Sequence, residues 1–164
     1  MTTKRSSAPA TDPQNDGGLL DPVNRRLLAL LGDDARTSVA ELARQVNMSA
    51  PAVRERLGRL EQAGVIRGYR VDVDPAAIGL PVAAWVRVRP GPGQLPKIAD
   101  LARRSPQVSE CHRVTGEDCF YMELHVRSIE ELEELIDGFL IYGTTTTSIV
   151  QSSPVPRRAV PTLA

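Results

Sequence analysis

Two short helical segments separated by a break of only two residues are the feature that most limits the fold. Ser38 can cap the first segment, and Glu41 follows three residues later, which is the spacing of a capping box. Ser49 can cap the second segment, and Pro51 then falls in the first turn, where a missing backbone N–H costs nothing. Because so short a break holds two helices close together, the pattern predicts a helix-turn-helix.

A third helix is predicted just before this pair. In "LLDPVNRRLLALLGDDAR", Asp21 can cap the helix and Pro22 suits its first turn. Apolar residues then recur at helical spacing. After the second helix of the pair, Gly64 is placed as a C-cap, and the alternating stretch "VIRGYRVDVD" (65–74) predicts a strand or wing. The segment therefore predicts a winged helix-turn-helix.

The second half of the chain alternates strand and helix patterns in the order β-α-β-β-α-β. Alternating strands are predicted in the stretches 80–93, which Pro and Gly close, 108–116 and 119–127, the last two joined by a short turn, and a β-branched strand closes the series at 144–151. Helical patterns lie at 94–105 and 129–140. This order is that of a ferredoxin-like domain, so the chain is assigned to the α+β class.

These patterns divide the chain into five parts. We expect a disordered N-terminal arm (1–18), a winged helix-turn-helix domain (19–70), a linker (71–80), a ferredoxin-like domain (81–155) and an extended C-terminal tail (156–164). In the ferredoxin-like domain two helices would cover one face of the sheet and leave Trp85 and Tyr121 on the other. A bare face with large aromatic residues predicts a dimer through this domain.

Composition excludes several classes of protein. Residues 1–70 carry 11 basic and 8 acidic side chains and residues 71–164 carry 9 and 12, so a net charge of zero hides a basic front half and an acidic back half. The two cysteines, Cys111 and Cys119, do not have the spacing of a metal site and predict reduced thiols. We see no membrane-spanning run, signal peptide, nucleophile–base pair or phosphate-binding loop, so we expect a cytoplasmic protein without catalytic residues, metal or cofactor.

The second helix of the pair is rich in arginine, and residues 49–70 hold five arginines against two glutamates. A solvated helix with salt bridges is the ordinary explanation of such a stretch. A DNA-recognition helix is the alternative, because the planar guanidinium grips phosphate or guanine with two hydrogen bonds. Val53, Leu57 and Leu60 form the buried stripe of this helix, which turns Arg54 and Arg59 toward solvent.

Taken together, the chain resembles the Lrp/AsnC family of bacterial and archaeal transcriptional regulators over roughly residues 19–158. The resemblance lies in the segment that runs from "LDPVNRRLLALL" through "SAPAVRERLGRLEQAGVI", in "VTGEDCFYMELHVRSIEELEELID", and in "YGTTTTSIV". Asn24 departs from it, since the family commonly has Asp there. The resemblance implies a winged helix-turn-helix, which binds double-stranded DNA, and an effector domain that forms dimers and then octamers or related rings. An amino acid or similar small molecule would bind at clefts between dimers.

The resemblance also suggests site residues. The candidate DNA-binding residues are Ser49, Ala50, Pro51, Arg54, Arg56, Arg59 and Arg67. We expect Arg54 to reach the groove and Arg59 or Arg67 to reach the backbone, whereas Arg56 either contacts DNA or braces the domain against an acidic neighbour. The candidate effector-binding residues are Gly116, Glu117, Asp118, Thr145, Thr146 and Thr147. Among them, Glu117 or Asp118 would meet an α-amino group, and backbone N–H groups with the threonine hydroxyls would take the carboxylate.

The leading hypothesis is an effector-responsive, sequence-specific regulator. One alternative is an architectural DNA-binding protein with little effector response. Another is an amino-acid sensor whose helix-turn-helix contacts only protein.

Overall fold

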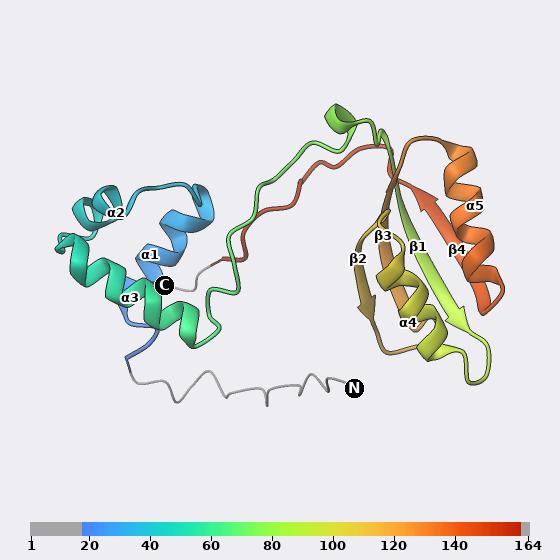
Figure 1. The fold of residues 1–164 in the computed structure, drawn as a ribbon, viewed down its shortest axis with the longest axis horizontal. Helices are drawn as coiled ribbons and strands as arrows, with labels where there is room; N and C mark the ends of the chain where they lie inside the picture. The colour runs from blue at the N-terminus through green and yellow to red at the C-terminus, as the bar shows by residue number, and fades with distance from the viewer. Residues whose placement is uncertain (1–17, 162–164) are drawn as a thin grey trace. The chain divides into compact units, whose positions relative to one another are not determined.

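The computed structural model describes residues 18–161, and these form two compact units. Of the described residues, 18–71 and 157–161 belong to the N-terminal unit, and 72–156 belong to the C-terminal unit (Figure 1). The expected N-terminal arm lies almost wholly outside the described residues, as do the last three residues of the expected tail.

Three helices make up the N-terminal unit: α1 (Pro22–Asp33), α2 (Val39–Gln45) and α3 (Ala50–Gln62). Each begins after the residue expected to cap it. The side chain of Asp21 accepts a hydrogen bond from the N–H of Asn24 (2.7 Å), and Ser38 and Ser49 do the same for residues three positions ahead. The tight turn between α2 and α3 places Asn47 at φ +53°, a conformation that asparagine tolerates better than most residues.

The helices pack through one apolar stripe from each. The buried residues of this core are Leu27, Leu30, Leu42, Ala43, Val53, Leu57 and Leu60. Each large member contributes about 1.5–3 kcal/mol relative to leaving it exposed, so the core fixes the angle between α2 and α3 and hence the outward face of α3.

The stretch 65–74, expected to form a strand or wing, contains no strand in the described chain. The next element is a short 3₁₀ helix, η1 (Ala76–Ile78). An alternating sequence becomes a strand only where a neighbouring strand takes up its backbone hydrogen bonds, and the described residues provide none here. Val71 and Val73 accordingly stay exposed.

The C-terminal unit has the expected order: β1 (Val82–Pro90), α4 (Leu95–Arg104), β2 (Val108–Arg113), β3 (Phe120–Val126), α5 (Ile129–Leu140) and β4 (Gly143–Ile149). The strands form one antiparallel sheet in the order β2-β3-β1-β4. Both helices cover the same face of this sheet (Figure 1). The ferredoxin-like arrangement is therefore confirmed.

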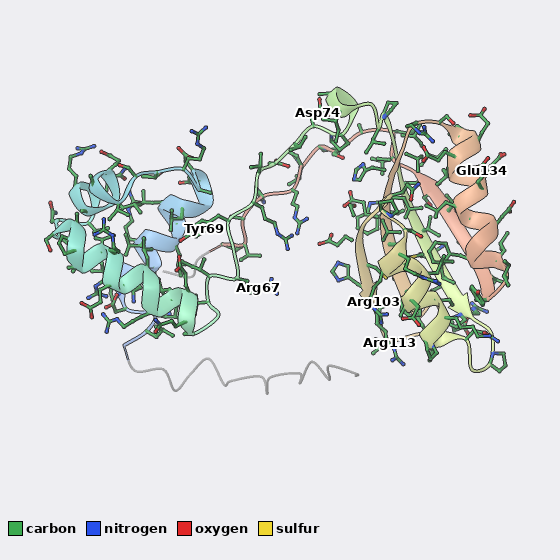
Figure 2. All side chains as sticks on the ribbon, in the orientation of Figure 1. Arg67, Tyr69, Asp74, Arg103, Arg113 and Glu134 are labelled. Carbon is green, nitrogen blue, oxygen red and sulfur yellow. The ribbon has the colours of Figure 1, made fainter. Side chains whose placement is uncertain are left out.

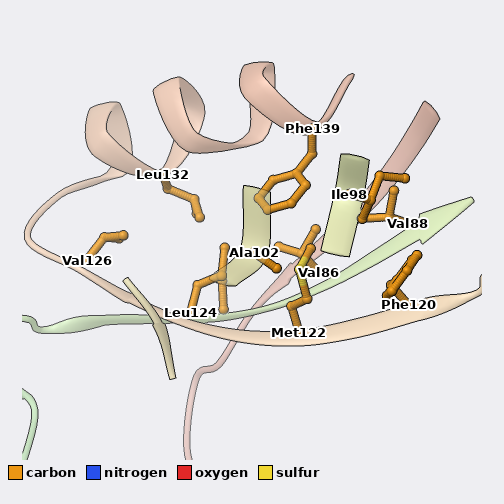
Figure 3. Packing of buried hydrophobic residues seen from close by; sticks show 11 residues of the cluster. Val86, Val88, Ile98, Ala102, Phe120, Met122, Leu124, Val126, Leu132 and Phe139 are labelled. Carbon is orange, nitrogen blue, oxygen red and sulfur yellow. The ribbon is translucent and has the colours of Figure 1, made fainter. Parts of the chain in front are cut away.

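The core of this unit lies between the sheet and the two helices (Figure 3). Alternate residues of β1 and β3 point into it, and Ile98 and Ala102 from α4 and Leu132 and Phe139 from α5 close it. The other face of the sheet, which we call the open face, carries Trp85, whose exposed fraction is 39%, and the half-buried Tyr121.

The C-terminal segment after β4 is extended and exposed, and its described end, residues 157–161, belongs with the N-terminal unit. Ala159 lies beside α1, and a Cβ at Gly32 would come within 3.0 Å of the Ala159 Cβ. Glycine at position 32 thus gives this segment room to pass. Among the described residues, no helix combines the length and apolar character that crossing a bilayer requires.

Candidate DNA-binding surface and effector site

The arginines of α3 lie in three different environments. Arg54 is exposed and has no hydrogen bond or ion pair with another described residue. Arg59 is also exposed, and its ion pair with Glu55, one turn earlier in α3, is loose at 3.9 Å. Such an exposed pair contributes little to stability, so both guanidinium groups are free to meet a charged partner.

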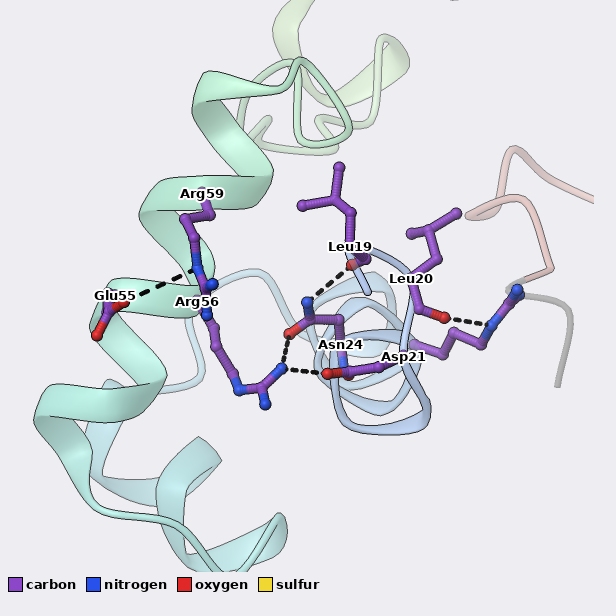
Figure 4. Close-up of polar contacts among 8 residues, drawn as sticks. Leu19, Leu20, Asp21, Asn24, Glu55, Arg56 and Arg59 are labelled. Atoms are coloured by element: carbon purple, nitrogen blue, oxygen red, sulfur yellow. Dashed lines mark hydrogen bonds and ion pairs between the residues drawn. The ribbon is translucent and has the colours of Figure 1, made fainter. Parts of the chain in front are cut away.

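Arg56 is different, because it points back toward α1 (Figure 4). Its Nη1 donates to the Asp21 carboxylate (2.5 Å) and to the side-chain oxygen of Asn24 (3.0 Å). Asn24 is buried and donates in turn to the carbonyl of Leu19 (2.8 Å). Among the described residues, Arg56 therefore acts as a brace between α3 and the start of α1.

The charge of Asp21 is stabilised by this network. The N–H of Asn24 contributes most, and the Arg56 guanidinium adds to it, so the pKa of Asp21 lies below its usual value in spite of an opposing effect of burial. Asn24, where the family commonly has Asp, is a member of this network, since its amide both accepts a hydrogen bond from Arg56 and donates one to the carbonyl of Leu19.

The start of α3 presents small or polar residues. Ser49 and Pro51 are exposed, and Ala50 is half-buried. The hydroxyl of Ser49 is turned to the helix, where it accepts from the N–H of Ala52 (3.4 Å). A helix N-terminus without bulky side chains allows a DNA backbone to come close.

The segment that follows α3 is attached to it by a tyrosine. The hydroxyl of Tyr69 donates to the carboxylate of Glu61 (2.9 Å). Burial and this hydrogen bond raise the pKa of Tyr69 to about 12. Arg67, two residues earlier, is exposed and has no partner among the described residues (Figure 2). It thus lies at the C-terminal end of α3 on a segment that Tyr69 holds in place.

In the C-terminal unit the hairpin between β2 and β3 turns through Gly116, whose φ of +111° strongly favours glycine. The acidic residues that follow it are not free. Asp118 lies 3.4 Å from Arg87 and 3.7 Å from Arg89, and Glu117 is hydrogen-bonded to Arg89. Nothing in the local sequence of the hairpin indicates these arginines, which come from β1.

The candidate threonines of β4 lie on two different faces. Thr146 pairs in register with Arg87 and is exposed on the open face, whereas Thr145 and Thr147 pair with the buried residues Val88 and Val86 and face the helices. Thr144, which sequence reasoning missed, pairs with Arg89 and is also exposed on the open face. Because successive residues of a strand point to opposite faces, alternation would have assigned these threonines to two faces if the inward face of β1 had been known.

The structure thus gathers one group of polar residues at the hairpin end of the open face. An open groove of about 700 Å³ lies elsewhere, between α4 and β2, and is lined by none of the candidate effector residues. The described residues contain no group of His, Cys, Asp and Glu side chains able to hold a metal ion.

Comparison with known proteins agrees with this two-part arrangement. Residues 20–67 match the winged helix-turn-helix DNA-binding family, and residues 82–160 match the Lrp/AsnC ligand binding domain. The transcriptional regulator AldR of Mycolicibacterium smegmatis is 35% identical in an alignment of 140 residues that covers 80% of this chain and 82% of AldR. The chain belongs to the Lrp/AsnC family.

Other Lrp/AsnC proteins match over nearly their whole length. Regulatory protein AsnC of Escherichia coli is 30% identical in an alignment of 152 residues that covers 87% of this chain and 97% of AsnC. A solved feast or famine regulatory protein of Mycobacterium tuberculosis, complexed with L-methionine, superposes with a TM-score of 0.81 at 29% identity, covering 87% of this chain and 99% of that one. For LrpC of Bacillus subtilis the TM-score is 0.79 at 28% identity, with coverages of 84% and 98%.

The resemblance inferred from sequence is confirmed. This Lrp/AsnC chain is a transcriptional regulator with an N-terminal DNA-binding helix-turn-helix and a C-terminal ligand-binding domain. AldR is described as a transcriptional regulator and AsnC as a regulatory protein.

Proposed function

We propose that this regulator reads its operator with α3 and that an amino acid bound near the β2–β3 hairpin changes its assembly and DNA affinity. The proposal that α3 reads the operator rests on the different environments of two of its arginines. Arg56 is engaged in the brace to α1, while Arg54 is exposed and unpaired among the described residues.

Arg54 would enter the major groove, where a guanidinium recognises guanine through O6 and N7. Arg59 and Arg67 would contact the phosphate backbone on either side, and Ser49, Ala50 and Pro51 would allow the backbone to approach the start of α3. Arg56 would support the orientation of α3 rather than contact DNA.

A homodimer would bring two copies of α3 to successive major grooves, about 34–36 Å apart, and would favour a pseudo-palindromic operator. The part of the open face around Trp85 is the surface we assign to this dimer, which leaves the hairpin end of that face for the effector. Dimers would assemble further, to an octamer or a similar ring, in the cytoplasm where chromosomal DNA is accessible.

For the effector, we propose a site around Gly116, Glu117 and Asp118, with Thr146 of β4 on the same face and Thr145 and Thr147 on the opposite face of that strand. The M. tuberculosis neighbour complexed with L-methionine supports an amino acid as the ligand class. The effector would shift assembly because it binds one assembled state more tightly than the other.

The decisive experiment is a thermal-shift screen with the twenty amino acids, read together with oligomer size. A ligand at about 100 times its Kd adds about 2.7 kcal/mol to stability, which is readily detected. The second readout is footprinting of DNA upstream of the protein's own gene and of neighbouring genes. A footprint without any amino-acid response would favour an architectural DNA-binding protein, and a response without a footprint would favour a sensor that contacts only protein.

A further inference from the structure

The ion pairs at the β2–β3 hairpin are the starting point. Arg87 and Arg89 project from β1 onto the open face, and Asp118 and Glu117 fold back over that face to meet them. Two guanidinium groups face two carboxylates, so the cluster is neutral as a whole but polar within. A free amino acid has the same character, with one carboxylate and one ammonium group.

The two acidic residues are held to different degrees. The side chain of Asp118 is 23% exposed and forms ion pairs with both arginines, whereas that of Glu117 is 79% exposed and, among the described residues, forms an ion pair with Arg89 alone. An exposed ion pair is worth about 0–1 kcal/mol, so the Glu117 pair is easily exchanged. Asp118, with two partners and less solvent, is the fixed member.

Hydroxyl groups complete the cluster on its other side. Antiparallel register places Thr144 opposite Arg89 and Thr146 opposite Arg87, and both threonines are exposed on the same face. A carboxylate on Arg89 would therefore have hydroxyl donors next to it.

We propose that Arg89 binds the carboxylate of the amino-acid effector in place of Glu117, while Asp118 stays in position and receives the effector's ammonium group. Glu117 is then an internal competitor that occupies the carboxylate position when no effector is bound. This inference rests on the proposed function, because it assigns the chemistry of the effector site. It also makes the site selective for ligands with a free carboxylate, since a carboxylate can take two charge-assisted hydrogen bonds from a guanidinium and a neutral group binds it more weakly.

The test measures ligand affinity by isothermal titration calorimetry on the full chain. The probe is the amino acid with the largest thermal shift, with L-methionine tried first, and its α-carboxamide is the matched ligand without the negative charge. Arg89→Gln should weaken binding of the free acid about tenfold or more. Glu117→Gln should instead tighten it, by up to about fivefold, because the competitor is removed.

Controls separate this role from a structural one. Arg104→Gln removes an exposed arginine from α4, outside the cluster, and should leave affinity unchanged. Arg89→Lys keeps the charge without the planar fork and should give intermediate affinity. Size-exclusion chromatography of each variant checks that assembly is retained. The wild type should prefer the acid to the carboxamide, and Arg89→Gln should lose most of that preference.

Three results would overturn the inference. If Glu117→Gln weakens binding as Arg89→Gln does, the pair only fixes the hairpin. If Arg89→Gln behaves like Arg104→Gln, or if the wild type binds the carboxamide as tightly as the acid, Arg89 does not bind the carboxylate, yet the proposed function stands. If the wild type binds none of the twenty amino acids, the proposed function fails and this inference fails with it.

Discussion

The guanidinium of Arg56 lies 2.5 Å from the carboxylate of Asp21, a residue 35 positions earlier in the chain. This contact connects the middle of α3 with the residue that caps α1. Only 20% of the Arg56 side chain is exposed, and 28% of that of Asp21. The pair is thus shielded from solvent more than the Arg59–Glu55 pair on α3, and it holds α3 at a fixed angle to α1.

Arg56→Ala should destabilise the N-terminal unit by about 1–2 kcal/mol, because it leaves the half-buried Asp21 and the buried Asn24 without their shared donor. Urea denaturation followed by circular dichroism measures this. Arg59→Ala is the matched control on the same helix and should change stability by no more than about 0.5 kcal/mol. Equal destabilisation by both variants would show that the contacts of Arg56 with Asp21 and Asn24 contribute no more to stability than the exposed pair of Arg59.

Arg54, unlike Arg56, should affect DNA binding and not stability. Arg54→Ala should leave stability unchanged and lower operator affinity about tenfold, with relaxed preference at one base pair. Fluorescence anisotropy over a range of salt concentrations, with operator and unrelated DNA, measures both quantities. If affinity and salt slope stay as in the wild type, α3 does not recognise the operator through Arg54.

Arg67→Ala separates backbone contact from base contact. The side chain lies past the end of α3 on the segment that Tyr69 attaches, so we expect a phosphate contact. Affinity for operator and unrelated DNA should fall together, and the slope of log K against log salt should decrease by about 1. A loss confined to the operator would instead place Arg67 in a groove.

Much of the fold followed from local signals. Asp21, Ser38 and Ser49 each cap the helix expected after them, because a cap and its helix are adjacent in sequence. The strand expected at 65–74 did not form, because a strand does not depend on adjacent residues alone. Alternation describes a side-chain pattern, whereas a strand also needs a hydrogen-bonding neighbour that no local pattern reveals.

The candidate sites show the same limit. The partner of Arg56 lies on another helix, and the partners of Glu117 and Asp118 lie on another strand. Neither pairing can be predicted from the residues that surround Arg56, Glu117 or Asp118 in the sequence. Sequence could name Arg56 as ambiguous and the hairpin acids as candidates, but only the register between β1, β3 and β4 shows what they face.

Stability in acid should depend on Glu131. Its carboxylate accepts from the Nε and the backbone N–H of Arg127 and from Gln107, and these contacts lower its pKa from 4.5 to about 2. A carboxyl whose pKa is lower in the folded than in the unfolded chain stabilises the fold at pH values above its unfolded pKa. This stability is lost as pH falls from about 4.5 toward 2. Glu131→Gln should therefore have a lower Tm than the wild type at pH 7, and the difference should shrink over that interval. Thermal unfolding at several pH values measures it, and a difference independent of pH would show that charge is not involved.

The single tryptophan of the chain reports on the open face. Trp85 is 39% exposed in one chain, so cover by a second copy should shift its emission to shorter wavelength, and dilution should reverse the shift. Ser148 is exposed and lies opposite Trp85 on β4, so Ser148→Arg places a charge in the proposed interface without disturbing the core. This variant should dissociate at about tenfold higher concentration or more and keep the long-wavelength emission, because a charge buried without a partner opposes association. Analytical ultracentrifugation supplies the matching oligomer sizes. A stable dimer whose Trp85 emission does not change with dilution would place the dimer contact on another surface.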